Sequence, residues 1–494
     1  MSLVLCRLDI PEEFSSRPNS LERLRNEDET LPMIAPLKRF IVLTSLLLCG
    51  HSSGTPKAPD GSERSIPNII FIMADDMGYG DPSCYGGKIN TPNLDKMAKE
   101  GLRFTDFHST GTVCSPSRAG LLTGRYQQRA GIDGVISADP ESAAYKLGLD
   151  PQTPTFLNTL SEKGYKTGVF GKWHLGYLEK FQPMNYGIDT FVGFVSGNID
   201  YHSHYDRMET FDWWHNRKKI KETGYSTHLI TEHTIRFIED AGDKPFCIYV
   251  AHEAVHSPLQ GPQDPIQRGP DKPKKQNPRP KNVVFTDMLL ELDKSVGQII
   301  DTVKEAGLEE NTLIMFTSDN GPMPQSSPGP LRGRKGSIYE GGHRVPTIAW
   351  WPKTIAANSE TAETAIGIDI FPTLLELTNI SSDKISFDGT SLLPVFKGGK
   401  LEPRKLYWRN SGLSPSRKEL TGPDSPKAVR DGPWKLVASP GYRQLELFNL
   451  DEDLGEKNDL SKKFPERTQQ MMADLKTWEA EMIKSLPYKI TDKK

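Results

Sequence analysis

The chain has 494 residues, about three times the usual size of a domain, so we expect one to three domains with room for a large core. It carries 61 Lys and Arg against 64 Asp and Glu, a formal net charge of -3, which argues against a protein built mainly to coat nucleic acid or anionic lipid. With 36% hydrophobic and 25% charged residues, the composition excludes a disordered or multi-span protein, and five cysteines are too few for a disulfide scaffold.

The first part of the chain, residues 1–54, is predicted to be an extension and a signal peptide. Lys38 and Arg39 precede the apolar run 40–48, and small residues follow it. A basic pair, a short apolar run and small residues are typical of a secretory signal, here near residues 33–54. The run is too short to span a membrane as a helix, and no later stretch reaches that length. We therefore expect an exported protein, periplasmic or extracellular, with no stable membrane span.

Three alternatives for this start remain open. Met33 could be the true first residue, and the segment could anchor the chain instead of being removed. Cys49 could carry a lipid, although Leu48 is a poor match to the small residue that such processing prefers. If the signal is removed, an odd number of cysteines remains, which leaves at least one thiol outside any internal disulfide. These are Cys84, Cys114 and Cys247.

From residue 67 on, apolar runs alternate with helical patterns. The predicted strands are 68–73, 166–170, 246–250 and 312–317, and the predicted helices are one that starts at Thr91-Pro92 and stops at Gly101, then 155–163, 227–241 and 285–306. Such alternation predicts an α/β fold with a large, mostly parallel sheet sandwiched by helices. We assign this catalytic domain to residues 66–385.

The pattern changes near residue 385. Short strands are predicted at 405–408, 427–430, 434–437 and 444–450, followed by an amphipathic helix at 465–484. Asp431-Gly432 lies between two of these strands and is a hairpin signal. Residues 386–494 are therefore expected to form a smaller C-terminal α+β subdomain, an antiparallel sheet with a packed helix.

Polar side chains follow all four predicted strands of the larger sheet, where ligands bind in open parallel sheets. They are Asp75 and Asp76, then Lys172 and His174, then His252 and His256, and finally Asp319 and Asn320. Any one such residue is more often a turn or cap residue, but four strand ends on one sheet edge favour a site. Three carboxylates and one amide oxygen suit a hard cation such as calcium or magnesium better than zinc.

The segment Cys114–Arg125 reads CSPSRAGLLTGR. Pro116 is tolerated in the first turn of a helix and Gly124 is a plausible stop, so the helix should begin at Cys114. Backbone N–H groups at that end favour an anion, and Arg118 projects on the same side one turn later. Taken alone, a buried apolar cysteine is the alternative interpretation.

This segment resembles the signature of the type I, formylglycine-dependent sulfatases of the alkaline-phosphatase superfamily, which include the arylsulfatases. Other segments resemble that family in the family's order: 74–81, 171–176, 256–259, 318–321, 333–336 and 339–342. The resemblance covers about residues 67–480 and implies a sulfuric ester hydrolase. It also implies that a separate maturation enzyme oxidises Cys114 to formylglycine.

The resemblance assigns roles by position. A calcium ion would be held by Asp75, Asp76, Asp319, Asn320 and the modified Cys114. The hydrated aldehyde would attack sulfur, and its second hydroxyl would later expel sulfate. Arg118 would orient this diol, Lys172 and Lys335 would bind sulfate oxygens, His174 would assist the expulsion, and His256 would protonate the leaving oxygen, while Ser196 would lie near the diol.

The substrate is left open by the sequence. A sulfated polysaccharide is the favoured class, with aryl sulfates as small substrates. The basic loop 271–281 could grip neighbouring sulfates or be merely solvated, and Trp213-Trp214 could stack on a sugar or pack in the core. The alternatives are a phosphate or phosphonate ester hydrolase of the same superfamily and, less favoured, a glycan-binding relative without activity.

Overall fold

The computed structural model describes residues 66–274, 278–410 and 424–486. The predicted signal segment 33–54, the alternative start Met33 and Cys49 lie outside this range. No helix within it is long and apolar enough to cross a membrane.

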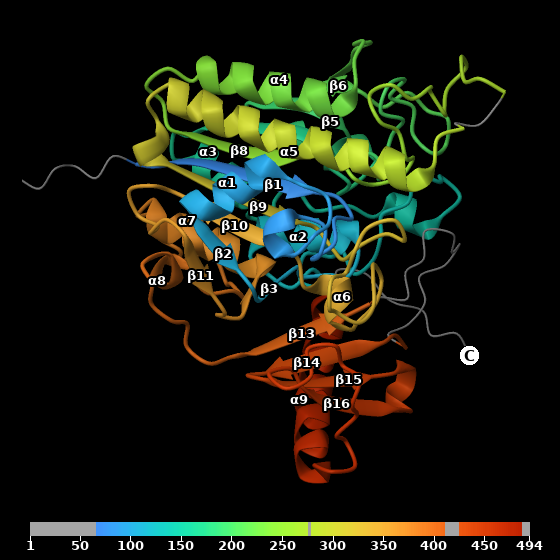
Figure 1. Cartoon of the computed structure of the whole chain (residues 1–494), viewed down its shortest axis with the longest axis vertical. Helices are drawn as coiled ribbons and strands as arrows, with labels where there is room; N and C mark the ends of the chain where they lie inside the picture. The colour runs from blue at the N-terminus through green and yellow to red at the C-terminus, as the bar shows by residue number, and fades with distance from the viewer. Residues whose placement is uncertain (1–65, 275–277, 411–423, 487–494) are drawn as a thin grey trace, which may run out of the picture. The chain divides into compact units, whose positions relative to one another are not determined.

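A large mixed sheet forms the centre of the described chain (Figure 1). The four predicted strands lie next to one another in its middle, and β1 pairs in parallel with β8 and β9 while β4 pairs in parallel with β8 and β5. The prediction of a mostly parallel sheet is confirmed, although short strands that the patterns missed extend it at both sides. In order across the sheet, the strands are β11 (Ser359–Thr361), β2 (Leu102–Phe104), β10 (Thr347–Trp350), β9 (Thr312–Ser318), β1 (Asn68–Ala74), β8 (Phe246–Ala251), β4 (Lys166–Lys172), β5 (Thr190–Phe194), β6 (Trp214–His215) and β7 (Lys218–Lys219).

Helices cover both faces of this sheet because its central strands are apolar on both sides. In β1, Ile70 and Ile72 pack on the face covered by α1, α4 and α5, and Ile69 and Phe71 pack on the face covered by α2, α3 and α7. Helices α4 and α5 lie side by side (Figure 1). The helices are α1 (Pro92–Glu100), α2 (Cys114–Thr123), α3 (Phe156–Ser161), α4 (Ser226–Glu239), α5 (Lys281–Glu305), α6 (Glu340–His343), α7 (Ile370–Leu377) and α8 (Leu393–Phe396).

The predicted C-terminal sheet is also present, with strands in the order β13 (Lys405–Arg409), β14 (Lys427–Asp431), β15 (Trp434–Ala438) and β16 (Leu445–Asn449). All its pairs are antiparallel, and Gly432 has the positive φ of 56° that the tight turn between β14 and β15 requires. Helix α9 (Pro465–Ser485) buries Leu475 and Met482 against this sheet. The domain boundary near residue 385 stays a prediction.

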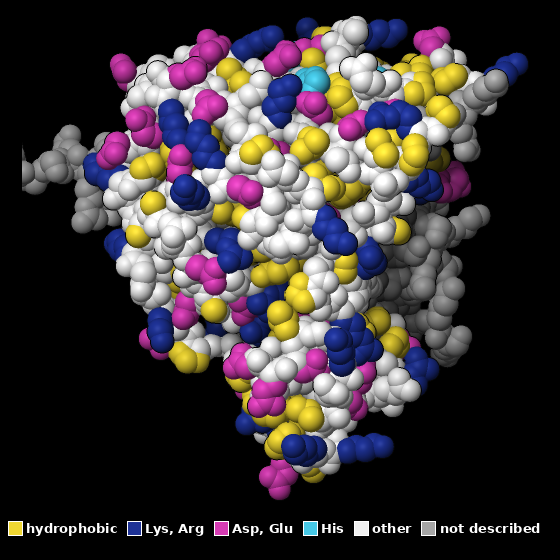
Figure 2. All heavy atoms as spheres, viewed as in Figure 1, with side chains coloured by type: hydrophobic (Ala, Val, Ile, Leu, Met, Phe, Trp, Pro, Cys, Tyr) yellow, Lys and Arg dark blue, Asp and Glu magenta, His cyan; other side chains and the backbone are white. Residues whose placement is uncertain are grey.

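A small two-stranded sheet, β3 (Phe107–His108) with β12 (Ala365–Ile366), completes the strands of the described residues. On the face seen in Figure 2, basic and acidic side chains are interspersed, in keeping with the near-balanced charge.

Candidate active site

The predicted site residues gather where β9, β1, β8 and β4 end at one edge of the sheet. Gly171, near the end of β4, shows how closely this edge is packed. Its φ is +104°, and a Cβ there would lie 2.1 Å from the carbonyl oxygen of Ala251 in β8. Only glycine fits this position, so β4 can bring the next residue, Lys172, into the buried centre beside Asp75.

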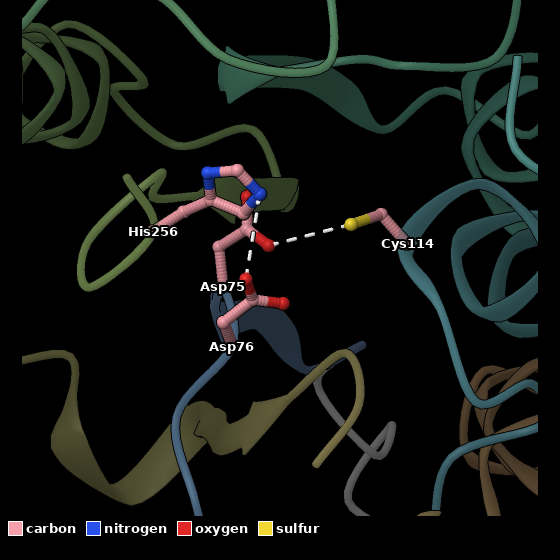
Figure 3. Close-up of side chains that lie close together, drawn as sticks. All are labelled: Asp75, Asp76, Cys114 and His256. Atoms are coloured by element: carbon pink, nitrogen blue, oxygen red, sulfur yellow. Dashed lines mark hydrogen bonds and ion pairs between the residues drawn. The ribbon is translucent and has the colours of Figure 1, made fainter. Parts of the chain in front are cut away.

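Cys114 is the first residue of α2, as predicted, and Gly124 ends that helix with a φ of 64°. Figure 3 shows its side chain directed at Asp75, Asp76 and His256. The sulfur lies 3.6 Å from Oδ1 of Asp75 and 3.4 Å from Nζ of Lys335. Burial raises the pKa of the Cys114 thiol to about 12, against the pull of Lys172 and Lys335. The unmodified side chain is therefore a protonated thiol at neutral pH and not a nucleophilic thiolate.

Two lysines neutralise the aspartates that follow β1. Nζ of Lys172 lies 2.5 Å from Oδ2 of Asp75, and Nζ of Lys335 lies 2.8 Å from Oδ2 of Asp76. Burial raises the pKa of both carboxyls, but the lysines, with His256, outweigh it, so that both pKa values lie below the usual range. The site therefore presents two ionised carboxylates beside two lysines, of which Lys172 is fully buried and Lys335 is partly exposed.

Arg118 lies beneath this layer and is wholly buried. Its guanidinium donates to Oδ2 of Asp319 at 2.8 Å and to the hydroxyl of Tyr249 at 3.2 Å. The same group lies 3.7 Å from Asp75. Tyr249 is a site residue that the sequence analysis missed, because a tyrosine inside a buried strand pattern carries no local sign of its partner.

The structure offers an oxygen-rich place for a cation. Nδ2 of Asn320 donates to Oδ1 of Asp76 at 2.7 Å, so the other atom of this amide, Oδ1, is an acceptor. That oxygen is buried and has no hydrogen-bond partner among the described residues. Asp76 itself adopts a left-handed backbone conformation, with a φ of 60°, next to this amide. An orphaned amide oxygen beside Asp75, Asp76 and Asp319 fits a calcium site.

Each of the two predicted catalytic histidines donates one ring N–H to a backbone carbonyl, and burial lowers the pKa of both rings. Nδ1 of His256 donates to the carbonyl of Ser257 at 2.6 Å, and its Nε2 lies 3.4 Å from Oδ2 of Asp76. Both ring nitrogens of His256 thus face oxygens that a protonated ring can donate to. His174 instead donates from Nε2 to the carbonyl of Ile136 at 3.0 Å, which leaves Nδ1 unprotonated and without a partner in the described structure.

Ser196, the remaining predicted residue, is buried and donates to the carbonyl of Asn198. Within the described residues it has no hydrogen bond to Cys114, so its role near the diol stays a prediction. Asn198, which the sequence analysis did not single out, lies 3.4 Å from Nδ1 of His256 and accepts from Arg268 at 2.7 Å. His252 contacts Ser295 at 2.9 Å, in keeping with the structural role expected for it.

The structure also describes Trp213, two further cysteines and Lys272 of the basic loop. Trp213 is fully buried, which supports packing over sugar stacking at that residue. The cysteines Cys84 and Cys247 are both free and do not pair. Lys272 of the basic loop is paired with Glu209 at 2.5 Å.

A cavity of about 480 Å³ begins at Ser257, directly after His256. Lys274 and Arg279 of the basic loop line it, whereas Lys275 lies outside the described residues. Arg279 is also paired with Asp264 and Asp287, so its charge is partly neutralised. The cavity is large enough for a sugar unit and lies beside the predicted leaving-group histidine.

The geometry defines an α/β protein whose buried centre brings together a helix N-terminus, basic side chains and carboxylates. A family profile described as Sulfatase matches residues 67–380, and one described as N-sulphoglucosamine sulphohydrolase, C-terminal, matches residues 334–484. The chain belongs to the sulfatase family and is a sulfate ester hydrolase, which confirms the resemblance drawn from the motifs.

Relatives of known name support this membership. N-acetylgalactosamine-6-sulfatase of Canis lupus familiaris is 34% identical over 395 residues, which cover 74% of this chain and 71% of that protein. Arylsulfatase A of Homo sapiens is 34% identical over 373 residues, covering 69% of each. The crystal structure of Ps i-CgsB in complex with k-i-k-neocarrahexaose superposes with a TM-score of 0.72 at 30% identity, covering 83% of this chain and 92% of that one.

Proposed function

We propose that this enzyme removes sulfate from sulfated glycans with a formylglycine, made from Cys114, as its nucleophile. The observation that carries the proposal is the place of Cys114, at the N-terminus of α2 and within 3.6 Å of both Asp75 and Lys335. A partner enzyme must carry out the oxidation, and the hydrated aldehyde then supplies an oxygen nucleophile in place of a protonated thiol.

The proposed calcium ion would be held by Asp75, Asp76, Asp319, Asn320 and the modified residue 114. The carboxylates and the orphaned amide oxygen of Asn320 support this choice, since calcium binds oxygen ligands. When bound, the ion supplies Lewis acidity and an orienting charge for the sulfate group.

The cationic side chains of the site have roles that follow from their contacts. Lys172 and Lys335 now neutralise Asp75 and Asp76, and we assign them to the sulfate oxygens, where they would offset charge that builds up as sulfur is attacked. Arg118 is fixed by Asp319 and Tyr249 behind the site. We assign it to orienting the diol, because a guanidinium held on two sides keeps its position.

The histidines divide the proton transfers. His256, when protonated, donates to Ser257 and Asp76, and we assign it to protonating the ester oxygen as the S–O bond breaks. His174 has an unprotonated Nδ1 because Ile136 fixes its Nε2 proton, and we assign it to accepting the proton of the second hydroxyl when sulfate is expelled. We assign Ser196 to substrate binding near the diol.

The substrate class rests on the relatives and on the cavity beside His256. One relative is named for N-acetylgalactosamine 6-sulfate, and one structural neighbour holds a neocarrahexaose. A cavity of about 480 Å³ at Ser257 supports a saccharide as the leaving group here. Lys274 and Lys281 of the basic loop line it and are placed to meet a second sulfate.

The decisive experiment is a desulfation screen of the matured enzyme against defined sulfated saccharides, with Cys114→Ala as the blank. Release of sulfate from at least one saccharide by the wild type alone supports the proposal. If the enzyme hydrolyses aryl sulfates but none of the saccharides, the glycan assignment is wrong. Matched aryl phosphates and phosphonates test the alternative ester class on the same protein.

We also propose export through the segment 33–54. Sequencing the N-terminus of the mature protein from the periplasm or the medium tests this. If the exported protein keeps residues 33–54, this segment is not a cleaved signal peptide. A lipid found on Cys49 would instead show that the segment is processed into a lipid anchor.

A further inference from the structure

A second cluster of potential metal ligands lies outside the catalytic centre. It consists of His215 at the end of β6, Glu222 in the loop after β7, and His233 in α4. Nε2 of His215 lies 2.9 Å from Oε2 of Glu222, and Nε2 of His233 lies 2.8 Å from Oε1 of the same carboxylate. The three potential ligand atoms, one from each residue, all lie within 4.8 Å of one another.

Another cluster of His and Glu in the described structure already contains a lysine where a metal ion would bind. His108, Glu340 and His343 are buried together, but Nζ of Lys435 lies 2.9 Å from Glu340 and 3.1 Å from Nε2 of His343. An ammonium group therefore already occupies the position that a cation would take. That cluster is a buried ion network and not a metal site.

No such ammonium or guanidinium group contacts Glu222 in the described structure. Glu222 contacts the two histidines and the indole of Trp213, whose Nε1 donates to Oε2 at 2.8 Å. An indole donor of this kind holds a ligating carboxylate in place, as outer partners do around metal ions. Glu222 thus accepts hydrogen bonds from three nitrogen atoms, as a carboxylate does.

The ligand set and spacing select a transition metal. Two imidazole nitrogens and one carboxylate are the ligands of many zinc sites, and neighbouring ligand atoms around tetrahedral zinc lie about 3.3 Å apart. The observed 2.8 and 2.9 Å need only a small expansion. The side chains remain 35%, 23% and 13% exposed, which leaves room for water as a fourth ligand.

We infer that His215, Glu222 and His233 form a second metal site, selective for zinc or a similar divalent transition ion. The ion would clip the edge hairpin β6–β7 to helix α4. Since β6 and β7 each have only two residues at the edge of the sheet, a cross-link there adds order that short strands cannot supply.

Zinc binding to the whole protein tests this inference. The Cys114→Ala background with calcium present removes ligation by the thiol of the catalytic centre, and it makes the result independent of formylglycine chemistry. We expect one zinc ion per chain by calorimetry, a rise in Tm with zinc, and a tetrahedral visible spectrum with cobalt. His233→Ala and Glu222→Gln should weaken zinc binding at least tenfold, the latter with little change of shape.

His228→Ala is the matched control. His228 is also in α4 and donates to Glu291 at 2.7 Å, but it belongs to no such cluster among the described residues. This variant should keep the zinc ion and the rise in Tm. Equal zinc binding by Glu222→Gln and the parent, or no zinc bound by the parent, overturns the inference. The three residues would then form a hydrogen-bonded cluster without a metal.

Discussion

Arg118 and Asp319 form a fully buried ion pair, with a guanidinium nitrogen 2.8 Å from the carboxylate and neither side chain exposed to solvent. The pair joins α2, which carries Cys114, to the end of β9. Burial and the neighbouring Asp75 raise the pKa of Asp319, whereas Arg118 opposes them. The pKa of Asp319 therefore lies above its usual range, and the ion pair ties helix α2 to the end of strand β9.

Arg118→Ala should therefore destabilise the fold as well as stop turnover. Removing one partner of a buried pair leaves an uncompensated charge and costs about 3–5 kcal/mol of the free energy of unfolding. Denaturant titration in the absence of calcium measures this. The double variant Arg118→Ala/Asp319→Asn should recover part of the loss, and no recovery would show that the pair is not the cause.

Cys114→Ala should lower turnover by about 10⁴-fold or more, because the nucleophile is lost. The Tm should stay close to that of the wild type, since a small buried thiol is replaced by a small apolar group. Mass spectrometry of the wild type, co-expressed with a maturation enzyme, should show the aldehyde at position 114. An active protein with intact cysteine would refute the formylglycine assignment.

His256→Gln should affect substrates according to their leaving groups. Without its proton, turnover of alkyl or sugar sulfates should fall by about 10²–10⁴-fold. Aryl sulfates with acidic phenols need little protonation, so they should lose much less. Steady-state rates on a series of esters check this, and an equal loss across the series would assign His256 to binding instead.

Calcium should stabilise the folded protein through Asn320. At about 100 times its dissociation constant, the ion should raise the free energy of unfolding by about 2.7 kcal/mol. Asn320→Ala removes the buried oxygen that lacks a partner, so calcium should raise the free energy of unfolding by less in this variant. After chelation, the variant should also need a higher calcium concentration than the wild type to recover its activity. Thermal melts with and without chelator measure both. An undiminished increment in this variant would exclude Asn320 as a ligand.

Glu253 should make the protein less stable at alkaline pH. Burial raises its pKa to about 8, against hydrogen bonds from Ser226 and the backbone of Ile199. Folding therefore takes up a proton between a pH of about 4.3, the unfolded pKa, and about 8, and in this window stability falls by about 1.4 kcal/mol per pH unit.

Glu253→Gln should remove this slope and raise the Tm relative to the wild type at pH 8. The comparison of Tm against pH for the two proteins isolates this residue from other titrating groups. Parallel curves for both proteins would mean that Glu253 is ionised in the folded state.

Much of the fold was readable before the structure because its patterns are local. The run 69–73 is apolar at every position, as expected of a strand covered on both faces, and β1 is such a strand. The short strands β2, β5 and β10 carry no comparable signal. They form because neighbouring strands offer hydrogen bonds, and no local pattern encodes a neighbour.

For the site, the sequence alone determined which residues lie at strand ends and that Cys114 begins a helix, since both follow from local patterning and from motifs within a few residues of each other. Only the tertiary structure decided that Tyr249 backs Arg118, that Ile136 sets the tautomer of His174, and that His215, Glu222 and His233 meet. Those contacts join residues brought together by strand order and helix packing, and their energy depends on distances that no stretch of sequence contains.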